Sequence, residues 1–434
     1  MLIRKITLSS IKSMGLRIIG LILAFLAQAI LSNLLGLEGF SQYSVFLSYV
    51  LLLAVALKFG MDITILKFGA EYFSGHTPGI INHFAVLIAR RLLFNILLAA
   101  LVISALRMIW PGFATLPSTT AALWMVLFSG SVAALGVFSQ FFRAAHMIGW
   151  SQTLDQVSRS ACLLLALLPF WFWNVPLNFE DAVIVASVSA VSAVIILGIM
   201  LHRIILQPIT VAATASDRSM WFSVSLPIFG ASLVGQLYAQ MQILMLDQLG
   251  SATDPGLYAV AVRLMTMTTF VLTALNAVTA PMIAEAFGRK DYQKLQRIVS
   301  LTARLATVAG GAFVSILVFA GPYILLIFGE GFDQAYPALL VLCVGSLFGA
   351  MTGPVGYVMT MTDQQTSFLS TSLINLILVA LLSAIGITYF GLIGAAAAAA
   401  FGQIFLNAVR WKYVWRKVGI DTSFIGIRSL KIDP

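Results

Sequence analysis

Two short phrases, one in each half of the chain, decide the fold. Residues 34–43 read LLGLEGFSQY, and residues 249–258 read LGSATDPGLY. Each phrase has Leu-Gly, then an acidic residue, a glycine and a tyrosine, and Tyr43 and Tyr258 lie 215 residues apart in a chain of 434. A phrase that recurs after half the chain indicates an internal repeat. We therefore expect two copies of one structural unit.

The repeat extends beyond these phrases. FGAEYFSG at 68–75 matches MIAEAFG at 282–288, and IARRLLFNILL at 88–98 matches TARLATVAGGA at 302–312, at nearly the same offset. The similarity therefore covers whole units and not an isolated motif.

A polar stretch separates the two units. LQPITVAATASDR at 206–218 contains a proline and is more polar than its flanks, which is typical of a linker. We expect an N-terminal lobe at 1–205, a cytoplasmic linker at 206–218 and a C-terminal lobe at 219–434.

The composition is that of a membrane protein. Hydrophobic residues make up 60% of the chain and charged residues 9%, and the mean hydropathy is +0.99. Soluble domains are about half apolar and about a quarter charged. Long uncharged runs without strict alternation predict membrane-spanning helices and argue against a β-barrel. The expected fold class is an all-α integral membrane protein.

Twelve spanning segments can be placed, six in each lobe. The first, an uncharged run from Ile18 to Leu37, is long enough to span, so we expect a retained helix and not a cleaved leader. An even number of helices gives both lobes the same orientation, related by an axis along the membrane normal. The expected segments are 18–35, 43–66, 84–109, 119–142, 153–173, 182–201, 221–246, 257–284, 303–328, 336–361, 368–389 and 392–415.

The basic residues predict the orientation. Of the 25 lysines and arginines, all but Lys58, Arg107 and Arg263 fall in segments that face one side if both termini lie on that side. Short loops rich in Lys and Arg stay in the cytoplasm. We expect a multi-pass protein of the bacterial inner (cytoplasmic) membrane with both termini cytoplasmic. The net charge of +9 is then a topology signal and does not indicate a nucleic-acid partner.

Motifs for catalysis are missing from the sequence. It has no GxxxxGK[ST] loop and no nucleophile triad, and its four histidines and two cysteines show no metal-ligand spacing. The expected extramembrane loops are too short for a soluble catalytic domain. We expect no enzyme activity, no cofactor and no metal site.

Charged residues inside the apolar segments are the candidate site residues. Burial of a charge at the bilayer centre costs about 2.5–3.5 kcal/mol or more. Lys58 and Asp62 are four residues apart, which would place them on one face of a single helix, either as an internal ion pair or as part of a cavity lining. Arg263 has no acid three or four positions away, so we expect it to face water or an anion. Arg17 lies at a helix end, where it either snorkels or binds, and Asp247 closes the seventh segment.

Three longer phrases resemble a known family. LPIFGASLVGQLYAQMQILMLDQLG…PGLYAVAVRL at 226–264, LLGLEGFSQYSVFLSYV…FGMDITILKFGAEY at 34–72 and APMIAEAFGRKDYQKLQRI at 280–298 resemble the Wzx-type oligosaccharide flippases of polysaccharide biosynthesis. These belong to the multidrug/oligosaccharidyl-lipid/polysaccharide exporter (MOP) superfamily. The resemblance extends over nearly the whole chain.

The resemblance implies an architecture and an activity. Two pseudo-symmetric six-helix lobes would form a V-shaped central cavity, and the protein would move a polyisoprenyl-diphosphate-linked oligosaccharide, a repeat unit of O-antigen, capsule or exopolysaccharide, to the periplasmic leaflet. Arg17 and Arg263 match arginines of the related lipid II flippases, whereas Leu23 replaces a third, which argues against lipid II as substrate. We expect Arg17, Lys58 and Arg263 to contact the substrate, and Asp62 and Asp247 are candidates for ion coupling.

Three alternatives remain open at this stage. A cation-coupled multidrug antiporter belongs to the same superfamily, and a membrane glycan polymerase or ligase and a biosynthetic scaffold are different classes. The expected partners are the lipid-linked oligosaccharide, membrane lipids, and possible contacts with a glycan polymerase and glycosyltransferases.

Overall fold

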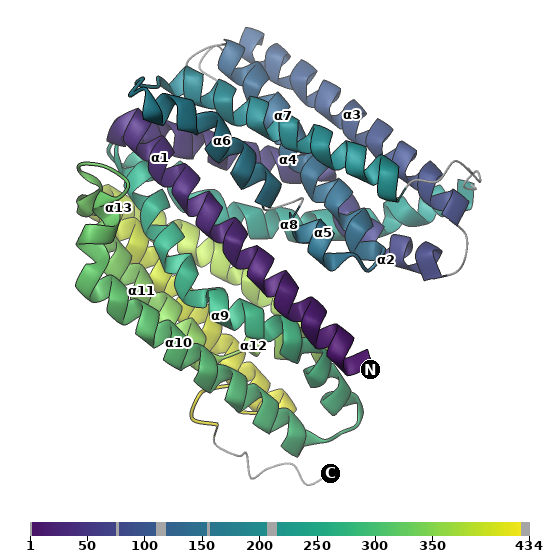
Figure 1. The fold of residues 1–434 in the computed structure, drawn as a ribbon. Coiled ribbons are helices and arrows are strands. Elements are labelled where there is room, and N and C mark those ends of the chain that lie inside the picture. The colour runs from purple at the N-terminus through teal and green to yellow at the C-terminus, as the bar shows by residue number, and fades with distance from the viewer. Residues whose placement is uncertain (1, 75–77, 110–118, 154–156, 206–214, 427–434) are drawn as a thin grey trace. The chain divides into compact units, whose positions relative to one another are not determined.

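The chain folds almost entirely into α-helices. The computed structural model describes residues 2–74, 78–109, 119–153, 157–205 and 215–426, and no strand occurs in these ranges (Figure 1). The elements in chain order are α1 (Leu2–Lys58), α2 (Met61–Ser74), α3 (Pro78–Ile109), α4 (Thr119–Ala144), α5 (Ile148–Gln152), α6 (Ser158–Phe172), α7 (Phe179–Ile204), α8 (Ala215–Leu249), α9 (Asp254–Gly288), α10 (Tyr292–Leu326), the 3₁₀ turn η2 (Phe332–Ala335), α11 (Tyr336–Thr352), α12 (Val355–Met361) and α13 (Gln365–Val418).

The helices form two compact units. The first runs from Met1 to Gln240 and the second from Met241 to Pro434, so the division falls within α8. The expected linker at 206–218 lies mostly outside the described residues, and its last residues, 215–218, begin α8. The lobe boundaries derived from the sequence therefore stay a prediction.

Eight of the described helices are long and apolar enough to cross a membrane. Two of them are bent at a glycine with non-helical dihedral angles, α1 at Gly36 and α13 at Gly391, so each consists of two helical halves. This confirms an all-α, multi-pass membrane protein. The count of twelve spans stays a prediction.

Two expected spans are not single helices. The segment 43–66 is interrupted between α1 and α2, where Phe59 and Gly60 have positive φ angles of 50° and 73°. The segment 336–361 is divided into α11 and α12 at Gly353, whose φ is 69°, and Pro354. Left-handed backbone at a glycine commonly ends a helix, and hydropathy does not detect it.

The two opening phrases occupy equivalent places. The first lies across the bend of α1 at Gly36, and the second spans the turn from α8 to α9. Tyr43 and Tyr258, the last residues of the phrases, are both buried in the helix that follows. The repeat seen in the sequence therefore corresponds to a repeated local structure.

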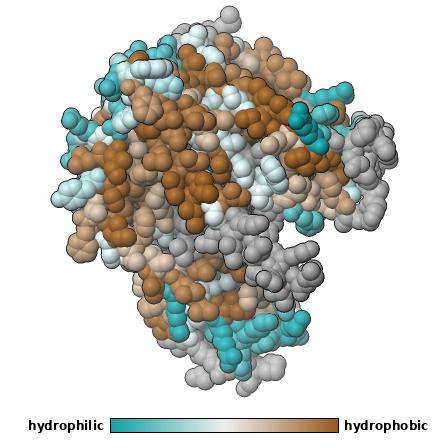
Figure 2. Space-filling view, viewed as in Figure 1, coloured by the Kyte–Doolittle hydropathy of each residue, from teal (hydrophilic) through white to brown (hydrophobic). Residues whose placement is uncertain are grey.

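Large apolar side chains cover the outside of several helices. On the face shown in Figure 2, they form broad continuous areas, and hydrophilic residues gather towards the edges. On α13 the exposed residues Ile374, Ile377, Leu381 and Ile385 recur at helical spacing and form one stripe. Exposed apolar surface of this extent is typical of a protein surrounded by lipid.

Small residues on α13 allow its close packing. A Cβ added at Gly394 would overlap the carbonyl oxygen of Gly386 in the other half of the bent helix. A Cβ added at Gly402 would overlap the side chain of Val379. A Cβ added at Gly345 of α11 would lie 2.9 Å from Cα of Ala400. The run GLIGAAAAAAFG at 391–402 is therefore a packing surface, as small residues in membrane helices usually are.

Candidate functional site

The site in the first unit begins at the break between α1 and α2. Gly60 adopts a φ of 73°, which glycine tolerates without a Cβ penalty, and α1 therefore ends at Lys58. Asn95 of α3 donates a hydrogen bond of 2.9 Å to the carbonyl oxygen of Leu57 in the last turn of α1. This side chain satisfies an acceptor that the helix end leaves open.

An ion pair bridges the break. Lys58 Nζ lies 3.3 Å from Asp62 Oδ2, and each side chain is 21% exposed. The expectation that both residues share one face of a single helix is wrong, because Lys58 ends α1 and Asp62 lies in the first turn of α2. Asp62 also accepts a 3.0 Å hydrogen bond from the amide of Ile63, in the first turn, where the helix dipole favours an anion. The pair is thus both partly buried and partly accessible.

A glycine makes room for the lysine. A Cβ added at Gly136 of α4 would lie 3.4 Å from Cδ and 3.5 Å from Nζ of Lys58. The side chain of Lys58 therefore runs along α4 at a position where a larger residue would press against it. Ser139 donates a hydrogen bond of 3.1 Å to the carbonyl oxygen of Gly136, so polar groups continue along this part of α4.

The N-terminal part of α8 packs directly on the break. A Cβ at Gly60 would overlap the carbonyl oxygen of Ser225 and would lie 2.9 Å from the amide nitrogen of Phe229. The hydroxyl groups of Thr64 and Ser225 share a hydrogen bond of 2.8 Å. The ring of Phe59 stacks on that of Phe229 with a centroid distance of 4.8 Å. Such close backbone contact requires a glycine at position 60.

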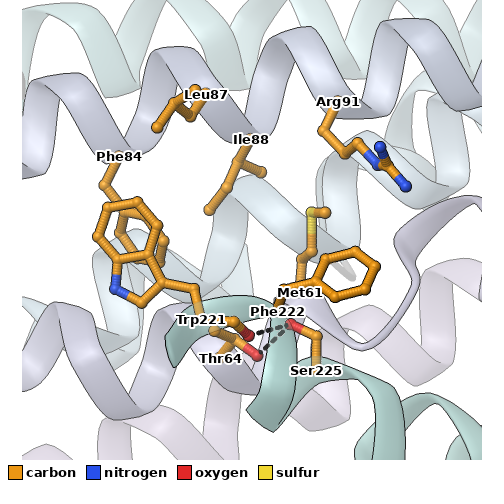
Figure 3. A pocket seen from close by; sticks show the side chains of 9 residues that line it. All are labelled: Met61, Thr64, Phe84, Leu87, Ile88, Arg91, Trp221, Phe222 and Ser225. Carbon is orange, nitrogen blue, oxygen red and sulfur yellow. Dashed lines mark hydrogen bonds between the residues drawn. The ribbon is translucent and has the colours of Figure 1, made fainter. Parts of the chain in front are cut away.

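A pocket lies beside this contact. Trp221 and Ser225 of α8 form one wall (Figure 3). The indole N–H of Trp221 donates a 3.0 Å hydrogen bond to the hydroxyl of Tyr72. The pocket is lined by Met61, Thr64, Phe84, Leu87, Ile88, Arg91, Trp221, Phe222 and Ser225. Its volume is about 180 Å³. Sequence reasoning did not find it, because its lining comes from three separate segments.

The candidate residues of the second unit lie on α8 and α9. Arg263 is half-buried on α9, with its Nη1 atom fully buried, and its carbonyl accepts a 2.7 Å hydrogen bond from Thr266. Asp247, in the last turn of α8, accepts a 2.8 Å hydrogen bond from the side chain of Gln248. The side chain of Arg17 lies outside the described part of the chain, although its backbone belongs to α1. The structure therefore joins Lys58 with Asp62 within the first unit.

One buried cation was missed by sequence reasoning. The sequence assigns Arg410 to the cytoplasmic side with most of the other basic residues, yet its side chain is buried in α13. Its guanidinium donates hydrogen bonds to the hydroxyl groups of Thr371 (3.2 Å) and Ser372 (2.6 Å) and to the carbonyl of Phe368 (3.1 Å). Arg410 therefore joins the two halves of α13 and has a packing role.

Buried polar residues without charge were also missed. Gln242, Asn276 and Asn375 are each less than a tenth exposed, and each has a buried side-chain oxygen. Amide side chains are uncharged, so charged residues in apolar segments do not reveal them. An isolated Asn or Gln in such a segment is a similar but weaker indication of a polar site. Among the described residues, no group of three or more His, Cys, Asp or Glu is placed to hold a metal ion.

Long apolar helices with charged side chains among them define a multi-pass membrane protein. Residues 9–287, well over half of the chain, match the family described as polysaccharide biosynthesis protein. The chain belongs to this family, and the resemblance to the Wzx-type flippases of the MOP superfamily is confirmed.

One curated relative matches part of the chain. The protein described as "Probable low-salt glycan biosynthesis flippase Agl15" from Haloferax volcanii is 24% identical over 172 residues, which are 39% of this chain and 36% of that protein. The match thus spans about a third of the relative's length.

Solved structures share the fold. An inward-facing multidrug resistance MATE family transporter of the MOP superfamily has a TM-score of 0.69 and 14% identity, with 92% of this chain and 94% of that chain covered. A MOP superfamily transporter from Pyrococcus furiosus, described with a binding pocket of reverse polarity, has a TM-score of 0.61 and 13% identity, with 94% of both chains covered. At these identities the likeness shows the fold alone.

Proposed function

We propose that the protein is a flippase that moves a polyisoprenyl-diphosphate-linked oligosaccharide from the cytoplasmic to the periplasmic leaflet of a bacterial inner membrane. Family membership supports the link to polysaccharide biosynthesis. The name of the Haloferax volcanii relative, a glycan biosynthesis flippase, supports transport of a lipid-linked glycan.

The observation that carries the proposal is the Lys58–Asp62 pair. A lipid diphosphate is an anion, and its passage through hydrocarbon requires positive charge on the protein. The pair places an ammonium group among apolar helices and leaves a fifth of the lysine side chain exposed. A phosphate can therefore replace Asp62 as the partner of Lys58, so the lysine is neutralised both before and during passage.

The other cations would act in the same way. We assign Arg17 and Arg263 to the substrate's phosphates, because a guanidinium offers paired donors that match phosphate oxygens. Asp62 and Asp247 are then the acids available for a coupling cation. The membrane potential supplies a driving force without ATP, because each charge moved through 100 mV is worth about 2.3 kcal/mol. An inside-negative potential favours outward movement of an anion.

A multidrug antiporter is the second candidate, and the fold shared with MATE transporters fits it equally well. The observation against it is that Lys58 and Arg263 lie in apolar helices, where cations suit an anionic substrate better than a cationic drug. A polymerase or ligase is a further candidate, and the flippase named as a relative favours transport over glycosyl transfer.

The test is a deletion strain complemented with variants. Loss of the protein should cause a lipid-linked saccharide to accumulate, protected from a membrane-impermeant glycosidase in spheroplasts and accessible in inverted vesicles. Unchanged lipid-linked saccharides together with lost drug efflux would favour the antiporter. Accumulation of single repeat units on the outer face would instead indicate a polymerase.

The role of Lys58 is tested by the neutral pair Lys58→Met/Asp62→Asn, which avoids leaving one charge alone in the site. We expect export to fall about tenfold or more, because a charge-assisted contact contributes about 1.5–3 kcal/mol. The matched control is Lys67→Met in α2, because this lysine is exposed and lies against the ring of Phe68. Normal export by the neutral pair at normal protein levels would exclude a role of Lys58 but not the flippase itself.

A further inference from the structure

The pocket beside the break combines apolar walls with one cation. Thr64 and Ser225 bond to each other, and the rest of the lining is apolar or aromatic except for Arg91 (Figure 3). At about 180 Å³ it is smaller than the roughly 300–1,000 Å³ of pockets that enclose a drug-sized ligand. It can therefore hold a segment of one extended chain, and the rest of such a ligand must lie outside.

Arg91 is fixed at the edge of this pocket. Its guanidinium carbon lies 5.5 Å from the ring centre of Phe94 on its own helix and 5.6 Å from that of Phe222 on α8. The side chain is exposed, and none of the ion pairs found among the described residues includes it. Two aromatic rings thus hold a positively charged donor group that still faces outwards.

The surface next to Arg91 is apolar and exposed, as expected of a face that lipid covers. Leu93, Phe94, Leu97 and Leu101 follow it on α3, and each is more than half exposed. This side of α3 is apolar for several turns and belongs to a span of mean hydropathy 2.2. A ligand that reaches the pocket from this side comes from the bilayer.

We infer that the pocket binds one acyl chain of a membrane phospholipid with an anionic headgroup, whose phosphate accepts hydrogen bonds from Arg91. The apolar walls suit the chain and the guanidinium suits the phosphate. Phe84 and Ile88 line the pocket on the buried side of α3, and Arg91 is exposed at its edge, next to the apolar outer face of the helix. Bilayer lipids surround this surface at a very high local concentration, so even a weak site is filled by mass action. This inference does not depend on the proposed transport activity.

The site has a consequence for α8. Its walls belong to α2, α3 and α8, and the polar contacts between α2 and α8 include the hydrogen bonds Thr64–Ser225 and Trp221–Tyr72. A bound chain fills the space between these helices and adds contacts on both sides. We therefore expect the lipid to hold the N-terminal part of α8 against α2 and α3.

The test is native mass spectrometry of the full-length protein, exchanged from detergent into mixed micelles with phosphatidylglycerol or phosphatidylcholine of identical chains. Wild-type protein should retain one phosphatidylglycerol in preference to phosphatidylcholine. Arg91→Gln should lower this preference about fivefold, which corresponds to the largest free energy typical of an ion pair near the surface. Arg91→Lys should keep most of it.

The neighbouring Arg90 provides the matched control. It is also exposed on α3 but does not line the pocket, so Arg90→Gln should retain lipid as the wild type does. Leu87→Trp, which fills the pocket, should reduce retention of both lipids. Thermal unfolding of each variant checks that it is folded.

Three results would overturn the inference. Equal phosphatidylglycerol retention by Arg91→Gln and wild type would remove the headgroup site. Loss of preference in Arg90→Gln to the same extent would show a general charge effect. Displacement of phosphatidylglycerol by an equimolar polyprenyl phosphate, with phosphatidylcholine unaffected, would show that the occupant is an isoprenoid and not a bilayer phospholipid.

Discussion

Gly60 determines the local structure of the first unit. It ends α1 and starts the turn to α2, which brings Lys58 and Asp62 together, and it lets the backbone of α8 approach. Any other residue would be strained at its φ of 73° and would also overlap the carbonyl of Ser225. The ion pair, the pocket and the contact with α8 therefore all depend on one residue without a side chain.

Gly60→Ala should lower the melting temperature of the protein in detergent, because left-handed backbone and the overlap together cost about 1–3 kcal/mol. The control is Gly235→Ala in α8, where an added Cβ meets nothing within 4 Å. Alanine in an exposed helix stabilises by about 0.5–1 kcal/mol relative to glycine. Equal effects of the two changes would refute the role given to Gly60.

Arg410 shows why a basic residue near a helix end need not be a topology signal. Its guanidinium lies 4.0 Å from the ring centre of Phe368 and is hydrogen-bonded to the first half of α13, while its backbone belongs to the second half. The bend at Gly391 makes this possible, because it lets the halves lie side by side. At the level of elements, α13 is thus a hairpin fastened by small residues and by one buried cation.

Arg410→Met should destabilise the protein by about 1.5–3 kcal/mol, because it removes hydrogen bonds from a charged donor and leaves their acceptors buried. Thermal unfolding in detergent measures this. The control is Arg289→Met, whose side chain is 73% exposed and pairs with Glu285 on the surface of α9, so its loss should change stability by less than about 0.5 kcal/mol. A silent Arg410→Met would contradict the buried role.

The contact at Gly394 gives a second test of the same hairpin. Gly394→Ala places a methyl group against the backbone of Gly386, so the halves of α13 must separate, at a cost of about 1–3 kcal/mol. In α7, Gly198→Ala meets nothing within 4 Å and should be neutral or slightly stabilising. If both substitutions leave the unfolding curve unchanged, the glycine contact does not limit packing.

Much of the helical architecture could be predicted, because the length and hydropathy of each apolar run can be read directly from the sequence. The interruption of 43–66 could not, since one glycine in an apolar run is a weak signal and the positive φ of Phe59 has none. The spacing of Lys58 and Asp62 allowed either an ion pair or a cavity lining; the ion pair is present, but across a break between two helices and not along one helix. The buried position of Arg410 and the pocket could not be predicted, because each depends on residues that the fold brings together from separate segments.

For the whole molecule, the orientation in the membrane follows from the basic residues and stays a prediction. A periplasm-specific alkaline phosphatase fused after Pro434 should be inactive, and a fusion within the expected outer loop at 174–178 should be active. The loop lies between α6 and α7 and contains no lysine or arginine. Activity of the C-terminal fusion would reverse the topology.

The central claim is transbilayer movement of a lipid-linked glycan, and the most direct test is made in proteoliposomes. Purified protein is reconstituted with a fluorescent polyprenyl-diphosphate oligosaccharide, and the fraction accessible to an external glycosidase is followed over time. The account predicts rapid loss of the protected half with wild-type protein, slower loss with Arg263→Ala by about tenfold or more, and wild-type rates with Arg289→Met. A protected fraction that stays constant with wild-type protein, at an imposed potential of either sign and in a sodium or proton gradient, would contradict the account.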